Sequence, residues 1–358
     1  MSVLSFLYSQ LFVTPPVPTY DFTGQTIIIT GANRGIGLEA ARHLLRLNAR
    51  RVVLAVRSTK RGEDAAAELK KSTTGHPGII QVEELDMASH SSVKAFAARM
   101  NKLDRLDGVL LNAGMYTHEF YLADGFLESH LVVNVINTFF LSFLLLPILR
   151  ASAERSHNAR ARISFVSSDR HVMYGLPEWK EENPFEVLSD PERARMDERL
   201  VKTPVVFARV ISMLIKDTSY MITKLMVILL TREMAVHVKP SDIIVNTFTP
   251  GYCESGLIDN IKGTTRVALN LLKKATARTA EVGGRTLVAA IVPWPESHGR
   301  YLNDSKIDDL ALSSFVRSDE GAKAQKKLWK DLMDLLEQRE PLVQSSISPG
   351  QQGPDARA

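Results

Sequence analysis

The sequence predicts an α/β protein with one doubly wound domain around a seven-stranded, mostly parallel sheet. Short runs of apolar, β-branched residues alternate along the chain with longer helical patterns. Most of these runs are apolar throughout, as expected for strands that are covered on both faces. A glycine-rich turn joins the first run to the first helix. Strands that alternate with helices form a parallel sheet, because each helix carries the chain back to the start of the next strand.

The elements can be placed in order from these patterns. We expect seven strands, at residues 25–30, 51–56, 79–85, 107–111, 162–166, 242–248 and 300–302. We expect helices at residues 36–47, 60–71, 89–103, 124–151, 218–238, 267–274 and 279–291. The helix over 124–151 contains a stretch, 131–149, that is apolar enough to resemble a membrane span. Because this stretch holds two asparagines and lies between two strands, we expect a buried core or interface helix.

The two ends of the chain lie outside the expected domain, which covers residues 21–344. Residues 1–20 begin with an apolar stretch shorter than the roughly 20 residues that span a membrane, and three prolines follow it. We expect a short helix docked on the protein surface, with weak association with a membrane surface as the alternative. Residues 345–358 lack apolar anchors and are expected to be a disordered tail.

Residues 169–217 interrupt the alternation of strands and helices. A structureless loop of this length is uncommon in a compact domain and is usually functional. Both of its ends lie where strands of such a sheet end, which is where ligands bind. We therefore expect a substrate lid, with a surface excursion packed against the domain as the alternative. The apolar side chains that would cover a ligand are Met173, Tyr174, Leu176, Trp179, Phe185, Val205, Val206 and Phe207.

The composition excludes several classes of protein. A formal net charge of +4 without a block of basic residues makes a nucleic-acid partner unexpected. One cysteine, Cys253, rules out an internal disulfide and a multi-cysteine metal site, so a reducing, cytoplasmic location is expected. The nine histidines form no metal-spaced cluster, and no metal is expected.

The glycine-rich turn predicts a nucleotide site. It follows the first strand and opens the first helix, so its backbone can approach a pyrophosphate closely while the helix presents free N–H groups to that anion. The residues expected to contact a cofactor here are Gly31, Asn33, Arg34, Gly35, Ile36 and Gly37.

Three further motifs follow in order along the chain. They are Asn112-Ala113-Gly114 after the fourth strand, Tyr220 with Lys224 four residues later, and Pro250-Gly251 after the sixth strand. With the glycine spacing of the turn, this series resembles the short-chain dehydrogenase/reductase family over roughly residues 24–304. The resemblance implies a Rossmann-type fold and cofactor contacts at all these motifs. Phrases such as Arg300-Tyr301-Leu302 after Gly299 resemble the retinol-dehydrogenase-like branch, including fungal members of biosynthetic pathways.

The end of the second strand indicates which nicotinamide cofactor is bound. An NAD enzyme has Asp or Glu about 20 residues beyond the glycines, whereas this chain has Arg57 there. Arg57 and Arg34 could both pair with a 2′-phosphate, with Lys60 or Arg61 assisting, so we expect NADP(H). By resemblance, Asp86 contacts the adenine; a helix N-cap is the alternative.

The catalytic residues follow from the chemistry of hydride transfer, since the alkoxide that forms must gain a proton. Tyr220 can donate it, and the charge of Lys224 on the same helical face would lower the phenol pKa. By resemblance, Ser168 binds the substrate oxygen and Asn134 supports a proton relay. The alternatives are a capping role for one serine of the pair Ser167 and Ser168, and a buried Asn134 that satisfies backbone groups, with Asn137 as the weaker candidate.

These residues predict an NADP(H)-dependent oxidoreductase that reduces a ketone or aldehyde of a hydrophobic small molecule, or oxidises the alcohol. The alternatives are a retinoid or steroid dehydrogenase at a membrane surface and a non-enzymatic NADP-binding regulator. The helices over 124–151 and 218–238 are apolar around most of their circumference. Because the family commonly pairs these two helices, the resemblance implies a homodimer.

Overall fold

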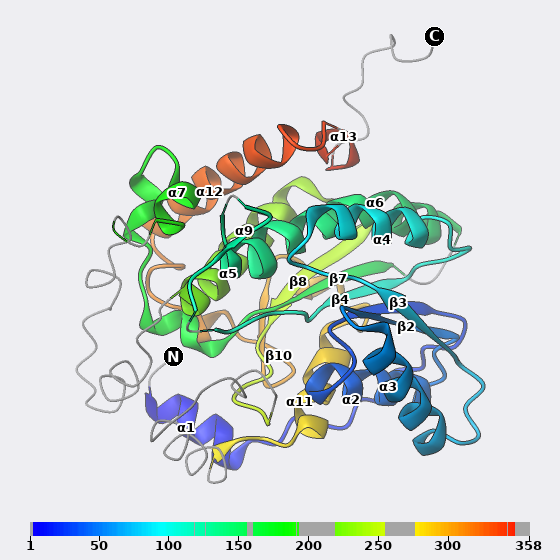
Figure 1. Ribbon diagram of the computed structural model, residues 1–358. Coiled ribbons are helices and arrows are strands. Elements are labelled where there is room, and N and C mark those ends of the chain that lie inside the picture. Colours follow the sequence, from blue (N-terminus) through cyan, green and yellow to red (C-terminus); the bar gives the residue numbers. More distant parts are fainter. Residues whose placement is uncertain are drawn as a thin grey trace, which may run out of the picture.

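A mostly parallel sheet of eight strands forms the centre of the protein (Figure 1). The computed structural model describes residues 3–117, 119–125, 127–155, 160–190, 192, 219–254, 276–341 and 343–347. The strands are β1 (Thr26–Thr30), β2 (Arg51–Val56), β3 (Ile79–Glu84), β4 (Gly108–Leu111), β7 (Ala161–Val166), β8 (Ile243–Phe248), β9 (Tyr301–Asn303) and β10 (Lys306–Ile307). Their order is β10-β9-β8-β7-β4-β1-β2-β3. The predicted doubly wound α/β fold is confirmed.

The count of seven strands was wrong by one. The eighth, β10, has two residues and pairs antiparallel with β9, whereas every other pair in this sheet is parallel. Asp304 and Ser305 form the tight turn between them, both with positive φ. A two-residue strand carries no periodicity, so the sequence gives no signal for it.

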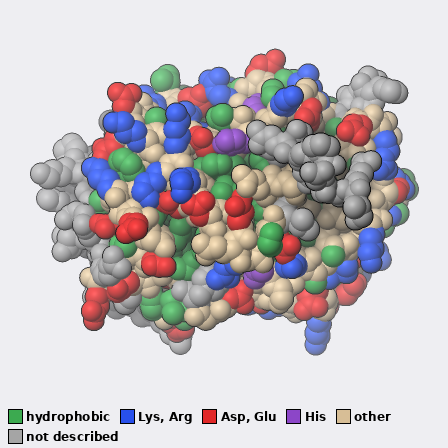
Figure 2. Space-filling model, turned by 90° about the horizontal axis from the view of Figure 1, so that it is seen from above, with side chains coloured by type: hydrophobic (Ala, Val, Ile, Leu, Met, Phe, Trp, Pro, Cys, Tyr) green, Lys and Arg blue, Asp and Glu red, His purple; other side chains and the backbone are tan. Residues whose placement is uncertain are grey.

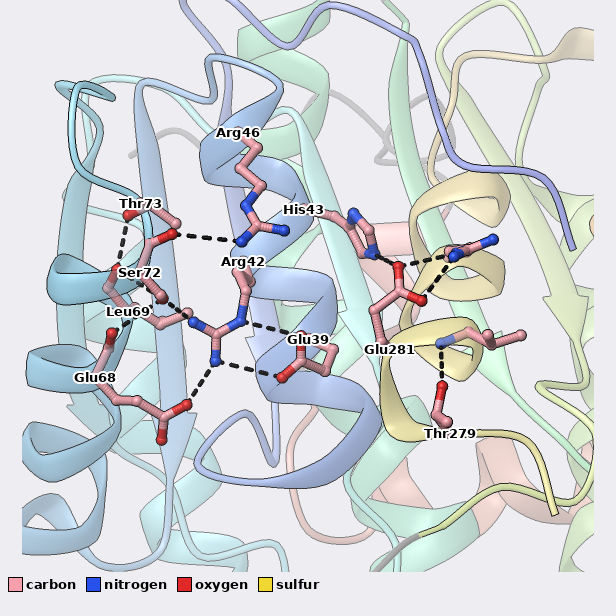
Figure 3. Close-up of polar contacts among 12 residues, drawn as sticks. Glu39, Arg42, His43, Arg46, Glu68, Leu69, Ser72, Thr73, Thr279 and Glu281 are labelled. Carbon is pink, nitrogen blue, oxygen red and sulfur yellow. Dashed lines mark hydrogen bonds and ion pairs between the residues drawn. The ribbon is translucent and has the colours of Figure 1, made fainter.

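One face of the sheet is covered by α2 (Gly35–Arg46), α3 (Thr59–Ser72) and α11 (Ala280–Ala290) (Figure 1). Charged side chains tie these helices together (Figure 3). Arg42 of α2 pairs with Glu39 at 3.0 Å and with Glu68 of α3 at 2.6 Å. His43 lies 3.0 Å from Glu281 of α11. This layer is thus joined by polar contacts above an apolar core.

The other face is covered by α4 (His90–Met100), α6 (Asn137–Arg155) and α9 (Ser219–His237), which pack through apolar side chains (Figure 1). The helical stretch Ser129–Arg155 is long and apolar enough to cross a membrane, but 89% of its most apolar window is buried in the protein. The expectation of a buried helix is therefore confirmed.

The predicted start of this helix at residue 124 was wrong. Strands β5 (Leu122–Ala123) and β6 (Leu127–Glu128) pair antiparallel here. Asp124 and Gly125, with φ of 52° and 74°, lie between the two strands, and positive φ is incompatible with a helix. The helix then begins as α5 (Ser129–Leu131) and passes through the π-helical turn η1 (Val132–Ile136) into α6.

A further helix, α12 (Asp319–Glu337), lies over α9 and α6 (Figure 1). Trp329 packs edge-on against Phe143 of α6, with ring centroids 5.6 Å apart, and stacks on His237 of α9 at 5.0 Å. The molecular face seen in Figure 2 mixes charged side chains of both signs with small apolar areas. Helix α12 of the same chain thus covers apolar side chains of α9 and α6, and the predicted homodimer stays a prediction.

Residues 345–347, the first three of the expected disordered tail, are helical. The short helix α13 (Val343–Ile347) packs on α6 with Val343 and Ile347 buried. Arg150 donates hydrogen bonds to the carbonyl oxygens of Ser346 and Ile347. Ile347 is the apolar anchor that the sequence interpretation overlooked, and residues 348–358 lie outside the described residues.

The first part of the expected lid packs on the domain. It forms the 3₁₀ turns η2 (Asp169–Met173) and η3 (Pro177–Lys180) and the short helix α7 (Pro184–Leu188). Tyr174, Leu176 and Phe185 are buried in the same core cluster as α6 and α9. For these residues the packed excursion is the correct alternative. Residues 193–217 of the expected lid, like the expected helix at 267–274, lie outside the described residues.

Candidate active site

Four loops meet at one edge of the sheet. Strands β1, β4, β7 and β8 are parallel neighbours, so their carboxyl ends lie side by side. The order of strands reverses between β1 and β4, and such a reversal opens a crevice for a ligand. The loops that follow these four strands carry most of the residues that the sequence singled out.

Thr30 at the end of β1 fastens two of these loops together. Its Oγ1 accepts hydrogen bonds from the backbone N–H groups of Asn112, at 3.0 Å, and Ala113, at 2.8 Å. In return, the Asn112 side-chain amide donates to the Thr30 carbonyl oxygen at 2.9 Å. Thr30 was not among the predicted site residues, although a polar residue ending an apolar strand was a signal for it.

Glycine is required at different positions of the turn for different structural reasons. Gly31 and Gly35 have φ of 70° and 59°, a region that favours glycine. A Cβ on Gly37 would lie 2.7 Å from Nδ2 of Asn112 and 2.8 Å from the Gly31 carbonyl oxygen. A side chain there would fill the space beside the backbone of the turn. The turn therefore fits a pyrophosphate at the N-terminus of α2, with Asn33, Arg34 and Ile36 beside it.

The residues expected at the adenosine end of the cofactor follow β2 and β3. Arg57 comes directly after β2 with its side chain exposed, and Arg34 precedes α2 and is also exposed. Asp86 accepts a hydrogen bond from the Ala88 backbone N–H at 2.9 Å. It stabilises the turn before α4, whose N-cap is Ser89 and not Asp86. The cofactor roles of these residues stay predictions.

Tyr220 and Lys224 lie on α9 at the carboxyl ends of β4 and β7. The Tyr220 ring packs edge-on against that of Tyr116, with centroids 5.4 Å apart. Lys224 Nζ lies 5.6 Å from the centroid of the Tyr220 ring and donates a hydrogen bond to the Val166 carbonyl oxygen at 2.8 Å. A Cβ on Gly114 would lie 3.6 Å from this Nζ. The structure thus brings the two residues together beside Gly114.

Burial dominates the electrostatics of this pair. It raises the pKa of Tyr220 to about 12 and lowers the pKa of Lys224 to about 8. We expected Lys224 to lower the tyrosine pKa, but its ammonium is turned to the Val166 carbonyl oxygen. The cation that favours the Tyr220 phenolate in this structure is Arg170, opposed by Asp169.

The two serines after β7 have different roles. Ser167 is buried, and its hydroxyl donates to the Lys224 carbonyl oxygen at 2.8 Å, which joins β7 to α9. Ser168 is only partly buried; its Oγ donates to Asp169 Oδ1 at 3.2 Å and accepts from the Arg170 N–H at 3.3 Å. The capping role expected of one serine belongs to Ser168, the N-cap of η2, and Ser167 has a separate structural role; the substrate contact of Ser168 stays a prediction.

His171 fixes the backbone of Ser168 and was missed by the sequence interpretation. Its Nδ1–H donates to the Ser168 carbonyl oxygen at 2.7 Å, and its Nε2 accepts from the Ser313 N–H at 3.2 Å. These two bonds define the neutral ring, whose pKa burial lowers to about 4. No local motif marks this residue, because Ser313 is 142 positions away.

Asn134 links the loop after β4 to α9. Its Oδ1 accepts from the Met115 N–H at 2.9 Å, and its Nδ2 donates to the Met115 carbonyl oxygen at 3.2 Å and to Thr223 Oγ1 at 3.1 Å. Thr223 Oγ1 donates to the Tyr220 carbonyl oxygen at 2.7 Å. These contacts match the alternative of a buried asparagine that satisfies backbone groups. The proton relay stays a prediction. Asn137 donates to Met87 instead.

Pro250 and Gly251 follow β8, and the N-terminal helix α1 (Val3–Phe12) lies against this turn. Gly251 has φ of 76°. Arg278 donates hydrogen bonds to the carbonyl oxygens of Pro250, at 3.3 Å, and Ser9, at 3.0 Å. The expectation of a helix docked on the protein surface is confirmed. Among the residues that the structure describes, no group of His, Cys, Asp and Glu side chains could hold a metal ion.

A glycine turn on the first strand of a doubly wound sheet, with a tyrosine–lysine pair at the same edge, defines an oxidoreductase of the dinucleotide-binding class. Comparison with known proteins identifies the family: residues 25–179 match the short chain dehydrogenase family. The chain is 58% identical to the short-chain dehydrogenase anuD of Penicillium roqueforti (strain FM164), over 98% of this chain and 87% of that protein. The chain therefore belongs to the short-chain dehydrogenase family.

Two further proteins illustrate the range of similarity. The short chain dehydrogenase/reductase dmxR8 of Cryptosporiopsis sp. (strain 8999) is 36% identical over 96% of this chain and all of that protein. A solved structure of Pseudomonas aeruginosa RhlG, titled an NADP active-site complex, has a TM-score of 0.56 at 22% identity, over 80% of this chain and 96% of that one. The second shares the fold alone. The retinol-dehydrogenase-like branch stays a prediction.

Proposed function

We propose that the protein is an NADP(H)-dependent oxidoreductase that reduces a ketone or aldehyde in a hydrophobic small molecule, or oxidises the corresponding alcohol. The observation that carries this proposal is that Tyr220, Lys224 and Ser168 lie at the same edge of the sheet as the glycine turn, with Lys224 bonded to the carbonyl at the end of β7. The similarity to fungal short-chain dehydrogenases supports a role in secondary-metabolite biosynthesis. The single cysteine of the sequence favours a reducing, cytoplasmic location. A non-enzymatic regulator is disfavoured, because it would not need the tyrosine and lysine.

The glycine turn, with Asn112, Ala113 and Gly114, would hold the cofactor, and Lys224 would hold its nicotinamide ribose. When bound, NADPH supplies a hydride to the substrate carbon. Ser168 Oγ–H orients the carbonyl oxygen, and the Tyr220 hydroxyl gives its proton to that oxygen. Because burial raises the pKa of Tyr220 to about 12, the hydroxyl keeps its proton at neutral pH until the oxygen becomes basic.

NADP(H) is favoured over NAD(H) because two exposed arginines, Arg34 and Arg57, flank the place of the adenosine ribose. No acidic side chain stands at the end of β2, since Arg57 is followed by Ser58, the N-cap of α3. A guanidinium forms paired hydrogen bonds with a phosphate and none as strong with a hydroxyl.

The proposal is tested by measuring NADPH absorbance with a panel of apolar ketones and aldehydes. Replacing Tyr220 by Phe keeps the ring and its contact with Tyr116 but removes the proton. We expect turnover to fall by about 10²-fold or more, with NADPH affinity largely retained. Tyr116→Phe is the matched control, because it removes a hydroxyl from the neighbouring ring. Equal turnover in wild type and Tyr220→Phe would show that another group is the acid.

A retinoid or steroid dehydrogenase at a membrane surface is the second candidate, and one observation favours it. Tyr8, Leu11 and Phe12 of α1 are 63%, 50% and 73% exposed, although all three are large apolar residues. Helix α1 carries no charged residue. Flotation with neutral lipid vesicles decides between the candidates. Binding that is lost in a Leu11→Ser, Phe12→Ser variant would support the membrane enzyme, and recovery in the soluble fraction would exclude it.

A further inference from the structure

Arg170 and Tyr252 form a polar pair that the proposed reaction does not use. The Arg170 guanidinium carbon lies 5.8 Å from the centroid of the Tyr252 ring, over its face. The Tyr252 hydroxyl oxygen is buried, and among the described residues it has no hydrogen-bond partner. Such a group costs about 1–3 kcal/mol of stability unless something binds it. Arg170 is half-buried, and within the described ranges its guanidinium forms no ion pair.

The pair stands next to the reacting groups. Arg170 is the second residue after Ser168, and its backbone N–H donates to Ser168 Oγ. Tyr252 is the second residue after Pro250. Thr249 Oγ1 holds the two loops together, because it accepts from the N–H groups of Asp169, at 3.2 Å, and Gly251, at 3.1 Å. Arg170 opposes the rise in pKa that burial causes at both Tyr220 and Tyr252, so its guanidinium lies near both hydroxyls.

Helix α1 fixes the backbone of Tyr252 from the other side. The Gln10 amide donates to the Tyr252 carbonyl oxygen at 3.0 Å, and its Oε1 accepts from the Tyr252 N–H at 3.0 Å. Gln10 also donates to the Thr276 carbonyl oxygen at 3.0 Å. An extension before the first strand thus holds a residue of the substrate edge in place. This arrangement makes the Tyr252 ring a fixed support for Arg170.

The neighbouring acid, Asp169, does not neutralise Arg170 by direct contact. Its Oδ1 accepts from the Ser168 hydroxyl, and it forms no ion pair with Arg170 within 4.0 Å in the part of the chain that the structure describes. Burial raises the pKa of Asp169, which favours its neutral form. Arg278, the other cation near Asp169, is already paired with Asp304 at 2.5 Å. Among the described residues, no carboxylate therefore pairs with the guanidinium of Arg170.

We propose that Arg170 and Tyr252 bind an anionic oxygen of the substrate while Tyr220 and Ser168 hold its carbonyl. An arginine fork and a phenol both donate hydrogen bonds, and a carboxylate or phenolate accepts them. The substrate class is then an apolar ketone or aldehyde that also carries a carboxylate or an acidic phenol. This inference rests on the proposed function and makes it more specific.

The test uses three aryl ketones that differ in one substituent: 4-acetylbenzoate, its methyl ester and 4-hydroxyacetophenone. Their binding to the full-length enzyme, saturated with NADP⁺, is measured by calorimetry, and their reduction by NADPH absorbance. In the wild type we expect the carboxylate to bind about tenfold or more tightly than the ester. Arg170→Gln should remove this difference and leave ester affinity unchanged. Arg170→Lys should keep part of it, because lysine retains the charge without the fork.

Two controls keep the outcome decisive. Arg317→Gln removes an exposed arginine elsewhere and should change nothing. Tyr252→Phe should weaken the carboxylate about fivefold, the effect of one lost hydrogen bond. If the hydroxyl ketone gains affinity with rising pH only when Arg170 is present, the phenolate is the natural anion.

The inference would be overturned if the wild type bound the carboxylate and the ester equally and the affinity for the hydroxyl ketone did not depend on Arg170. Arg170-dependent binding of an anion without reduction of any ketone would instead refute the proposed function and leave the anion site standing. Ester affinity and melting temperature report whether each variant is folded.

Discussion

The two corners of the site are built in different ways. The cofactor corner, made by the loops after β1 and β4, is held by hydrogen bonds between a side chain and a backbone group of residues at the strand ends themselves, such as Thr30 with Asn112. The substrate corner, made by the loops after β7 and β8, is held by side chains from distant segments, such as Gln10 on Tyr252 and Ser313 on His171. The cofactor corner is therefore fixed by residues of short sequence motifs. The substrate corner is fixed by side chains that come from distant parts of the sequence.

Of the substitutions that distinguish the two corners, Gly37→Ala should have the largest effect on NADPH affinity. The new Cβ would lie 2.7 Å from Asn112 Nδ2 and 2.8 Å from the Gly31 carbonyl oxygen, so the turn must open. We expect NADPH affinity to fall by about 100-fold, because overpacking of this kind costs about 1–3 kcal/mol. Fluorescence titration of NADPH measures the effect.

Gly108→Ala provides the matched control. Its Cβ would lie 2.9 Å from Ile27 Cδ1, at the opposite end of the sheet from the cofactor turn. We expect a similar loss of unfolding free energy in both variants, measured by urea denaturation, but a loss of NADPH affinity in Gly37→Ala alone. Equal affinity in the two variants would mean that the turn does not hold the cofactor.

A smaller effect is expected at the outer side of the cofactor corner. Arg57→Asp replaces an exposed cation after β2 with an anion and should weaken NADPH by about 1–3 kcal/mol, while NADH binding changes little. Lys70→Asp makes the same charge change at the far end of α3 and serves as the control. Equal affinities of the wild type for NADPH and NADH would contradict the assignment of the cofactor.

The sequence predicted the fold and the cofactor corner because both depend on local signals. The apolar runs predicted the strands of the sheet, and the spacing of the glycines predicted the position of the turn. Tyr220 and Lys224 were found because one helical turn separates them. Ser168 was distinguished from Ser167 only by resemblance, and the structure supplies the physical reason: the Ser167 hydroxyl is used inside the fold, on Lys224.

The substrate corner was not predictable in this way. The contacts of Gln10 with Tyr252 join residues 242 positions apart, and no periodicity reports such a meeting. Helix α12 was missed for a related reason. Without it, the apolar surfaces of α6 and α9 suggested a partner subunit, whereas Trp329 and its neighbours supply the cover from the same chain. A helix that is apolar all round indicates that something covers it, but not what does.

The smallest expected effect concerns His171, which supports the substrate corner, and its contribution to the free energy of unfolding at acidic pH. Burial holds the pKa of His171 at about 4, below the ordinary 6.5, so between these values the unfolded chain binds a proton that the folded protein does not. The stability contributed by the neutral ring is therefore present above pH 6.5 and is lost as the pH falls. The linkage relation gives a loss of about 1 kcal/mol between pH 7 and pH 5.5 from this residue.

His171→Gln isolates that contribution, because a glutamine amide can still donate to the Ser168 carbonyl oxygen and accept from the Ser313 N–H but does not titrate. Its absolute stability will differ from that of the wild type, since the side chain has another shape. The measurement is therefore the slope of unfolding free energy against pH, from urea denaturation at pH 5.5, 6.0, 6.5 and 7.0. We expect the variant to be less sensitive to acid by about 1 kcal/mol over this range. Identical slopes would mean that folding does not lower the pKa of His171, and the assignment of a neutral buried ring would be wrong.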